Sequence, residues 1–86
     1  MKHTYFDTEH FGNCLRAAIA RKKLSVRAFR RAYFPEMTYI TVYRWTKGLC
    51  MPKLEQMQTL IDIFGWSRVK RWLRFTFDTT SNKQIS

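Results

Sequence analysis

Apolar residues recur along this chain at the three- and four-residue spacing of amphipathic helices. The first such segment carries its apolar side chains at Phe11, Cys14, Leu15, Ala18 and Ile19. At about 100° per residue these positions share one face, which predicts a helix from Phe11 to about Lys23. The basic run Arg21-Lys22-Lys23 at its C-terminal end is favourable, because this is the negative end of the helix dipole.

A second helix is predicted after a tight connection. Ser25 is a good N-cap residue, and Pro35 disfavours helical geometry at Phe34, so the helix should end at Phe34 or just before it. Its shared apolar face consists of Phe29, Ala32 and Tyr33.

The stretch MTYITVYRWTKG, residues 37–48, predicts a third helix with two different faces. Thr38 is the expected N-cap, with Met37 and Val42 placed for a hydrophobic staple, and Gly48 is the expected C-cap. The face predicted to be buried holds Val42, Trp45 and Leu49. The face predicted to be exposed holds Ile40, Tyr43, Arg44 and Lys47.

Two further helices complete the predicted all-α fold. Pro52 suits the first turn of the fourth helix, Gly65 its end, and Ser67 the N-cap of a short fifth helix. The predicted buried positions are Leu54, Met57, Leu60, Ile61, Phe64, Val69, Trp72 and Leu73. Residues 1–10 are predicted to be an N-terminal arm, residues 11–74 a compact five-helix domain, and residues 75–86 a frayed tail.

Positive charge is the main compositional feature. The 86 residues carry 16 Lys and Arg against 6 Asp and Glu, a net charge of +10. Between Arg16 and Lys53 the only acid is Glu36. A basic face of this kind is typical of proteins that bind nucleic acid.

Other chemistry has little support in the sequence. Cys14 and Cys50 are too few and too far apart for a metal-site spacing, and without a signal peptide they are expected to be reduced residues in or near the core. Acidic and histidine residues at positions 3–10 are interpreted as a polar lead-in and not as a metal site. We find no nucleophile–base pattern and no phosphate-binding Gly loop, so we expect no enzyme, cofactor or small-molecule ligand. No apolar run reaches the roughly 18 residues of a membrane span, and we expect a cytoplasmic protein.

The helix order resembles a helix-turn-helix domain, and the residues resemble the lambda-repressor-like (Cro and XRE type) DNA-binding family over about residues 11–73. The fourth-helix stretch PKLEQMQTLIDIFGW and the segment VYRWTKG carry most of this resemblance. The distance from Phe29 to Val42 exceeds the family's usual spacing, and the turn Gly is missing. Ala32 is expected to take over the close helix–helix contact. A family ion pair is replaced by Ile19 and Thr46.

The resemblance implies a role for the third helix in the major groove of duplex DNA. Carried over by position, base reading falls to Tyr39, Ile40 and Arg44, and the predicted exposed face adds Tyr43. Phosphate binding is expected at the ends of the second, third and fourth helices. The candidates are Ser25, Arg27, Arg30, Arg31, Thr41, Lys47 and Lys53.

The hypothesis is a sequence-specific DNA-binding regulator, typical of a phage or mobile-element repressor. Two alternatives stay open. One is an antitoxin-like interaction module, or a homodimer formed through the C-terminal helix, with Trp72, Phe75 and Phe77 at the interface. The other is a binder of single strands, which would need exposed aromatic side chains for bases to stack on.

Overall fold

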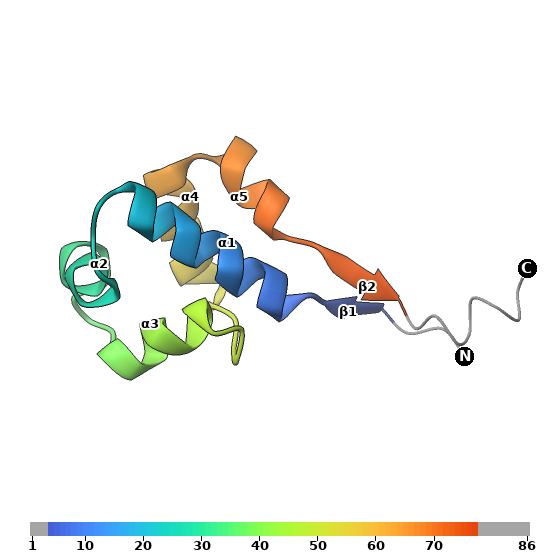
Figure 1. Ribbon diagram of the computed structural model, residues 1–86, viewed down its shortest axis with the longest axis horizontal. Helices are drawn as coiled ribbons and strands as arrows, with labels where there is room; N and C mark the ends of the chain where they lie inside the picture. The colour runs from blue at the N-terminus through green and yellow to red at the C-terminus, as the bar shows by residue number, and fades with distance from the viewer. Residues whose placement is uncertain (1–3, 78–86) are drawn as a thin grey trace, which may run out of the picture.

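Five α-helices and two short strands make up the part of the chain that the computed structural model describes, residues 4–77 (Figure 1). The prediction of five helices is confirmed. In chain order the elements are β1 (Thr4–Phe6), α1 (Thr8–Arg21), α2 (Val26–Tyr33), α3 (Tyr39–Thr46), α4 (Leu54–Phe64), α5 (Trp66–Trp72) and β2 (Phe75–Phe77).

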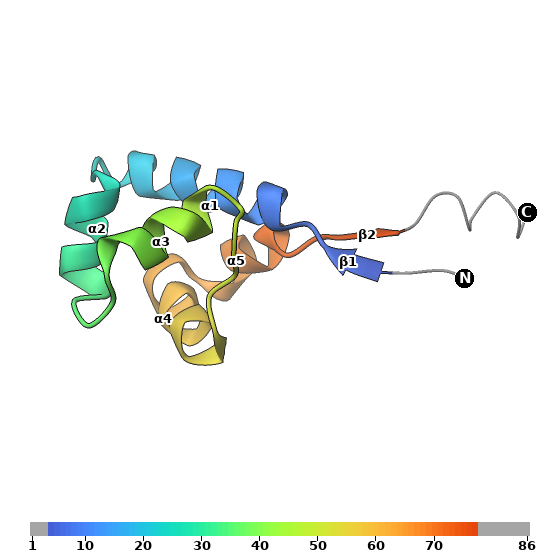
Figure 2. The same cartoon turned by 90° about the horizontal axis from the view of Figure 1, so that it is seen from below.

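The two strands form an antiparallel ribbon that projects from the helices (Figures 1 and 2). Phe6 pairs with Phe75 in its register, and their rings lie 4.7 Å apart. At its base the Arg74 guanidinium lies 2.8 Å from an Asp7 carboxylate oxygen. The predicted arm and tail therefore meet, which the sequence patterns did not indicate. The remainder of both segments, residues 1–3 and 78–86, lies outside the described part.

Helix α1 begins at Thr8, earlier than predicted. Asp7 is its N-cap, with a side-chain oxygen that accepts a hydrogen bond of 2.9 Å from the His10 backbone N–H. The N-cap oxygen satisfies a backbone donor that the first helical turn leaves unpaired. The first turn thus depends on a cap, while the apolar pattern that predicted the helix starts only at Phe11.

The core forms around α1, which lies between α3 and α5 in Figure 1. Phe11 meets Trp72 of α5 edge-on, with ring centres 5.9 Å apart. The buried apolar residues are Phe11, Leu15, Ala18, Ile19, Phe29, Phe34, Val42, Trp45, Leu60, Val69 and Trp72. Large aromatic side chains provide much of this core, as expected for a domain with little interior volume.

Helices α1 and α3 approach until their backbones touch. A Cβ at Gly12 would lie 2.8–2.9 Å from backbone atoms of Trp45, Thr46 and Gly48. A Cβ at Gly48, whose φ is +73°, would lie 2.8 Å from the Cα of Glu9. The close helix contact therefore belongs to α1 and α3. The prediction that Ala32 provides such a contact is wrong, because Ala32 is exposed.

The turn between α2 and α3, residues 34–38, is held by one buried ring and one guanidinium. Phe34 is 1% exposed and meets the Trp45 ring edge-on at 5.2 Å. Arg30 donates hydrogen bonds to the carbonyls of Pro35, at 3.2 Å, and Met37, at 2.9 Å. The longer turn is thus a packed element that fixes where α3 begins.

Four details of the helices differ from prediction. Pro52 is buried and precedes the N-cap of α4, which is Lys53. Ser67 lies inside α5, whose N-cap is Gly65 with a φ of +90°. Leu49 and Leu54 were predicted to be buried, yet they are 71% and 86% exposed because each lies in or beside the α3–α4 connection. Helix α3 itself ends at Thr46, with Lys47 as its C-cap and Gly48 just beyond.

Within the described residues, no helix is both long and apolar enough to span a membrane.

Candidate nucleic-acid interface

The outward face of α3 begins at a well-formed helix cap. Thr38 has extended backbone geometry, and its hydroxyl oxygen accepts a hydrogen bond of 3.3 Å from the Thr41 backbone N–H. Val42 and Trp45 on the inner face are 0% and 2% exposed. Because the inner face is fixed in the core, the orientation of the opposite face is fixed as well.

The four residues predicted to read bases lie on this opposite face or at its edge. Ile40 is 52% exposed and Tyr43 is 36% exposed. Arg44 is exposed, while Tyr39 is partly buried. Ile40 and Tyr43 give this face exposed apolar surface, as Leu49, Leu54 and Trp66 do elsewhere in the domain. The predicted division of α3 into two faces is confirmed for these residues.

Two tyrosines and two cations form a continuous stack along this face. The ring centres of Tyr39 and Tyr43 lie 5.7 Å apart in a stacked arrangement. The Arg27 guanidinium carbon lies 4.3 Å from the Tyr39 ring centre, and the Lys47 ammonium lies 5.5 Å from that of Tyr43. We call these four residues the cation–tyrosine stack. Each cation–ring contact is worth about 0.5–1 kcal/mol at an exposed site, enough to bias where the charges lie.

The stack joins residues to which the sequence analysis gave separate roles. Arg27 and Lys47 were predicted to bind phosphates, and the structure brings them to opposite ends of the two tyrosines. The spacing of Tyr39, Tyr43 and Lys47 follows successive helical turns, so this part was available from the sequence. The Arg27 contact was not, because it crosses the turn from α2 to α3.

The other predicted phosphate ligands are distributed around the stack. Ser25 caps α2, and its hydroxyl oxygen accepts a bond of 3.1 Å from the Ala28 N–H. The Thr41 hydroxyl lies 2.8 Å from that of Thr38. Arg31 and Lys53 are exposed on α2 and at the start of α4. The backbone N–H groups at the N-termini of α2 and α3, which Ser25 and Thr38 cap, favour a bound anion.

Arg30 has a structural task that the sequence did not reveal. It is only partly exposed, and its guanidinium donates to the Pro35 and Met37 carbonyls that form the turn. A planar guanidinium with several N–H donors suits such a double contact. Arg30 therefore acts first on the position of α3, and a phosphate contact would have to use its remaining donors.

Among residues 4–77, the interface cations have no acidic partner. The one ion pair of the described residues, Asp7 with Arg74, lies at the base of the ribbon. There the hydrogen bond from the His10 N–H, followed by that from Arg74, lowers the pKa of the Asp7 carboxyl. The described acidic residues therefore leave the positive charge around α3 unneutralised.

Cys14 and His10 form the remaining pair of side chains with reactive groups. The Cys14 sulfur lies 3.5 Å from the His10 Nε2, which is also 3.1 Å from the Arg71 carbonyl oxygen. Burial raises the pKa of the Cys14 thiol, so the thiol is protonated at neutral pH and is a weak nucleophile. Cys50 is also a free, partly buried thiol. The contact of the His10 ring with the Arg71 carbonyl oxygen connects α1 to α5, which is a structural role.

Comparison with known proteins shows no match to a protein-family model, to a curated protein or to a solved structure. The resemblance to the lambda-repressor-like family therefore stays a prediction from the sequence. The case for function depends on the geometry and charge described above.

Proposed function

We propose that this protein is a sequence-specific regulator that binds double-stranded DNA in the cytoplasm, with α3 in the major groove. The type proposed is a phage or mobile-element repressor with a lambda-repressor-like helix-turn-helix fold. The observation that carries the proposal is the exposed face of α3, where Ile40 and Arg44 lie beside the cation–tyrosine stack. A major groove admits one α-helix, and a helix that enters it needs apolar and hydrogen-bonding groups on its outer face.

Each exposed side chain has a chemical counterpart on the duplex. Arg44 is suited to the O6 and N7 acceptors of a guanine, a pairing worth about 1–3 kcal/mol of discrimination. Ile40 is suited to a thymine methyl group, which accounts for an aliphatic residue on the exposed face. Tyr39 and Tyr43 are placed at the same face for contacts with a base, a sugar or a phosphate.

Phosphate contacts would flank these base contacts. Arg27 and Lys47 are held at the two ends of the stack, so Tyr39 and Tyr43 lie between two cations. Ser25 and Thr41 belong to the first turns of α2 and α3, where backbone N–H groups favour phosphate oxygens. Contacts of this kind orient a protein on DNA without reading its sequence.

A selection of bound duplexes from random DNA tests the proposal. The wild type should enrich one motif, and Arg44→Ala should flatten the preference at one position of that motif while the rest is kept. The matched control is Lys70→Ala, which removes one exposed positive charge from α5. Absence of an enriched motif, or equal affinity for single strands, would contradict the proposal.

The two alternatives have weaker support. Trp72 is 4% exposed and packs in the core, so it is not part of the predicted interaction surface, although Trp66 at the start of α5 is exposed. Phe75 is 53% exposed, whereas the side chain of Phe77 lies outside the described part. The binder of single strands keeps a structural basis, because five aromatic side chains of the described residues are exposed: Phe6, Tyr33, Tyr43, Trp66 and Phe75. The comparison of single with double strands in the test above decides between the two. Light scattering would test the homodimer separately from DNA binding.

A further inference from the structure

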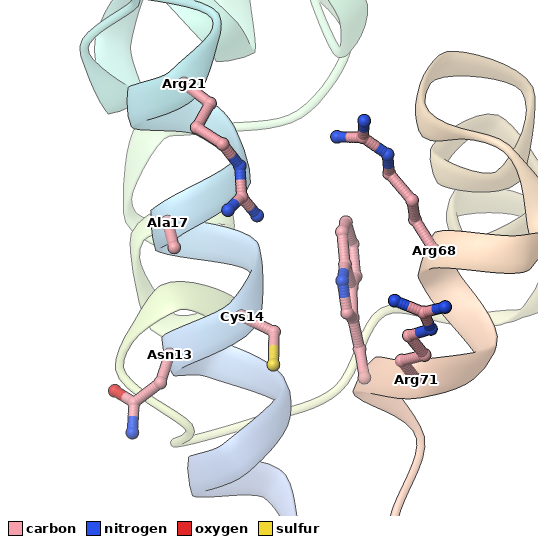
Figure 3. A pocket seen from close by; sticks show the side chains of 7 residues that line it. Asn13, Cys14, Ala17, Arg21, Arg68 and Arg71 are labelled. Carbon is pink, nitrogen blue, oxygen red and sulfur yellow. The ribbon is translucent and has the colours of Figure 1, made fainter.

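A second basic site lies between α1 and α5. The hollow there has a volume of about 580 Å³ and is open to solvent on one side. Its lining residues are Asn13, Cys14, Ala17, Arg21, Arg68, Arg71 and Trp72. In Figure 3 the side chains of Arg21 and Arg68 extend into the gap from opposite sides, Arg21 downward and Arg68 upward, and Arg71 lies beneath Arg68. Three arginines from two helices thus line one open hollow.

None of the described residues that line this hollow is an acid. Helix α5 carries Arg68, Lys70 and Arg71 and contains no carboxylate. A smaller hollow continues the first one, shares Arg21 and Arg68 with it, and adds Lys22. Bringing like charges together costs free energy unless an opposite charge joins them. The groove is therefore electrostatically complementary to an anion with more than one charge.

The shape of the groove favours a small anion over a duplex. It is concave, and its volume is in the range of sites for small molecules, about 300–1,000 Å³. Cys14, Ala17 and Trp72 form the apolar part of its lining, and Arg21, Arg68 and Arg71 form the charged part. Guanidinium groups bind phosphate oxygens in a two-pronged geometry that a Lys cannot match.

The groove is also separate from the candidate DNA interface. In Figure 1 α3 lies on one side of α1 and α5 lies on the other. Figure 2, turned by 90°, keeps α1 and α3 adjacent, with α4 at the opposite edge from α1. A ligand in the groove would leave Ile40 and Arg44 uncovered.

We propose that the groove between α1 and α5 binds a small ligand that carries a diphosphate group. Arg21, Arg68 and Arg71 are the residues that contact the phosphoryl oxygens, and the apolar part of the lining accommodates the uncharged remainder of such a ligand. This site goes beyond DNA binding, which the proposal for α3 describes, and it stands or falls independently of that proposal.

The test is titration calorimetry with sodium pyrophosphate on the whole chain, at low salt and at about 0.15 M salt. The double variant Arg68→Gln/Arg71→Gln should weaken binding by roughly tenfold or more, because charged donors to phosphate are lost. Both side chains are exposed, so the variant should fold, and thermal unfolding checks this. The matched control, Lys23→Gln/Lys70→Gln, loses the same charge outside the groove and should change binding by less than about twofold.

A second measurement locates the ligand. Pyrophosphate should shift the NMR signals of the Arg21, Arg68 and Arg71 side chains in the wild type and leave α3 unaffected. Equal weakening in both double variants would mean diffuse attraction to a basic surface and would overturn the site. The absence of pyrophosphate binding, or NMR shifts centred on α3, would also overturn the site. Tighter binding of a short polyglutamate peptide than of pyrophosphate would overturn it as well, because the ligand would then be an acidic protein segment.

Discussion

Gly12 of α1 and Trp45 of α3 are so close that a Cβ on Gly12 would lie 2.8 Å from the Trp45 carbonyl oxygen. The Thr46 carbonyl oxygen and the Gly48 nitrogen lie at a similar distance from the same point. All three are backbone atoms, which cannot rotate away as a side chain can. The distance between α1 and α3 is thus set by a missing side chain, and the outer face of α3 depends on it.

Gly12→Ala should destabilise the domain by about 1–3 kcal/mol, because the new methyl group overlaps the α3 backbone. Helix propensity alone predicts the opposite sign, a gain of up to about 1 kcal/mol for replacing a helical Gly by Ala. Thermal unfolding followed by circular dichroism distinguishes the two. Asn13→Ala, an exposed neighbour in the same helix, serves as the control and should change stability little. A Gly12→Ala variant as stable as the wild type would refute the close contact.

Phe34→Ala should cost about 3–5 kcal/mol, since it empties a fully buried site between Phe29 and Trp45. If that variant does not fold, Phe34→Leu should fold with a loss of about 1 kcal/mol. Leu49→Ala is the informative control. The apolar pattern assigned Leu49 to the core, yet it is 71% exposed, so its truncation should cost under about 0.5 kcal/mol. Urea unfolding measures all three, and equal losses at Phe34 and Leu49 would contradict the structure.

Arg30→Lys should lower stability by about 1–2 kcal/mol although the charge is kept, because one ammonium cannot replace the guanidinium at both turn carbonyls. Arg31→Lys, at the exposed neighbouring position, should have no such effect. Unfolding by urea gives the two values. If the two variants lose stability equally, Arg30 does not hold the turn.

Lys47→Ala should weaken binding to every duplex alike and lower the salt slope of the affinity by about one. The reason is that, in the proposed binding mode, Lys47 at the C-terminal end of α3 contacts a phosphate and no base edge; its ammonium lies 5.5 Å from the Tyr43 ring centre. Fluorescence anisotropy over a range of salt concentrations measures the slope, with Lys23→Ala as a control outside the interface. A change in the preferred base sequence, instead of a uniform loss, would place Lys47 among the base-reading residues.

Acid should destabilise the wild type through Asp7. The pKa of Asp7 in the folded state lies below its ordinary value of 3.8. Ionised Asp7 therefore adds to the free energy of unfolding above pH 3.8, and this addition is lost as the pH falls through the folded-state pKa. Asp7→Asn removes this contribution, and its melting temperature should fall less than that of the wild type from about pH 5 to pH 3. Glu36→Gln, at an exposed position in the turn, controls for a general charge effect. Parallel curves for wild type and Asp7→Asn would contradict the prediction.

The sequence predicted the helices well where a cap and an apolar stripe agree. Ser25 and Thr38 both act as N-caps, and α2 ends before Pro35 as expected. Periodicity failed at Leu49 and Leu54, because each lies near a helix end where the regular rotation per residue no longer applies. It also missed the ribbon, since strands of three residues are too short to show alternation.

The candidate interface could be predicted in part. The outward positions of Ile40, Tyr43 and Arg44 follow from helical geometry, and the structure exposes them. Contacts that cross from one helix to another do not follow from spacing along the chain. The place of Arg27 against Tyr39, and the convergence of Arg21 with Arg68, required the packing of separate elements.

The ribbon has a consequence for engineering the protein. Thr4 and Phe77 are partners in adjacent strands, so the two ends of the described fold lie one strand spacing apart, away from α3 (Figure 1). A short Gly-Ser linker could join these positions, with new termini opened at the exposed connection around Leu49. Such a circular permutant should keep the helical packing, because no core contact passes through the rejoined end.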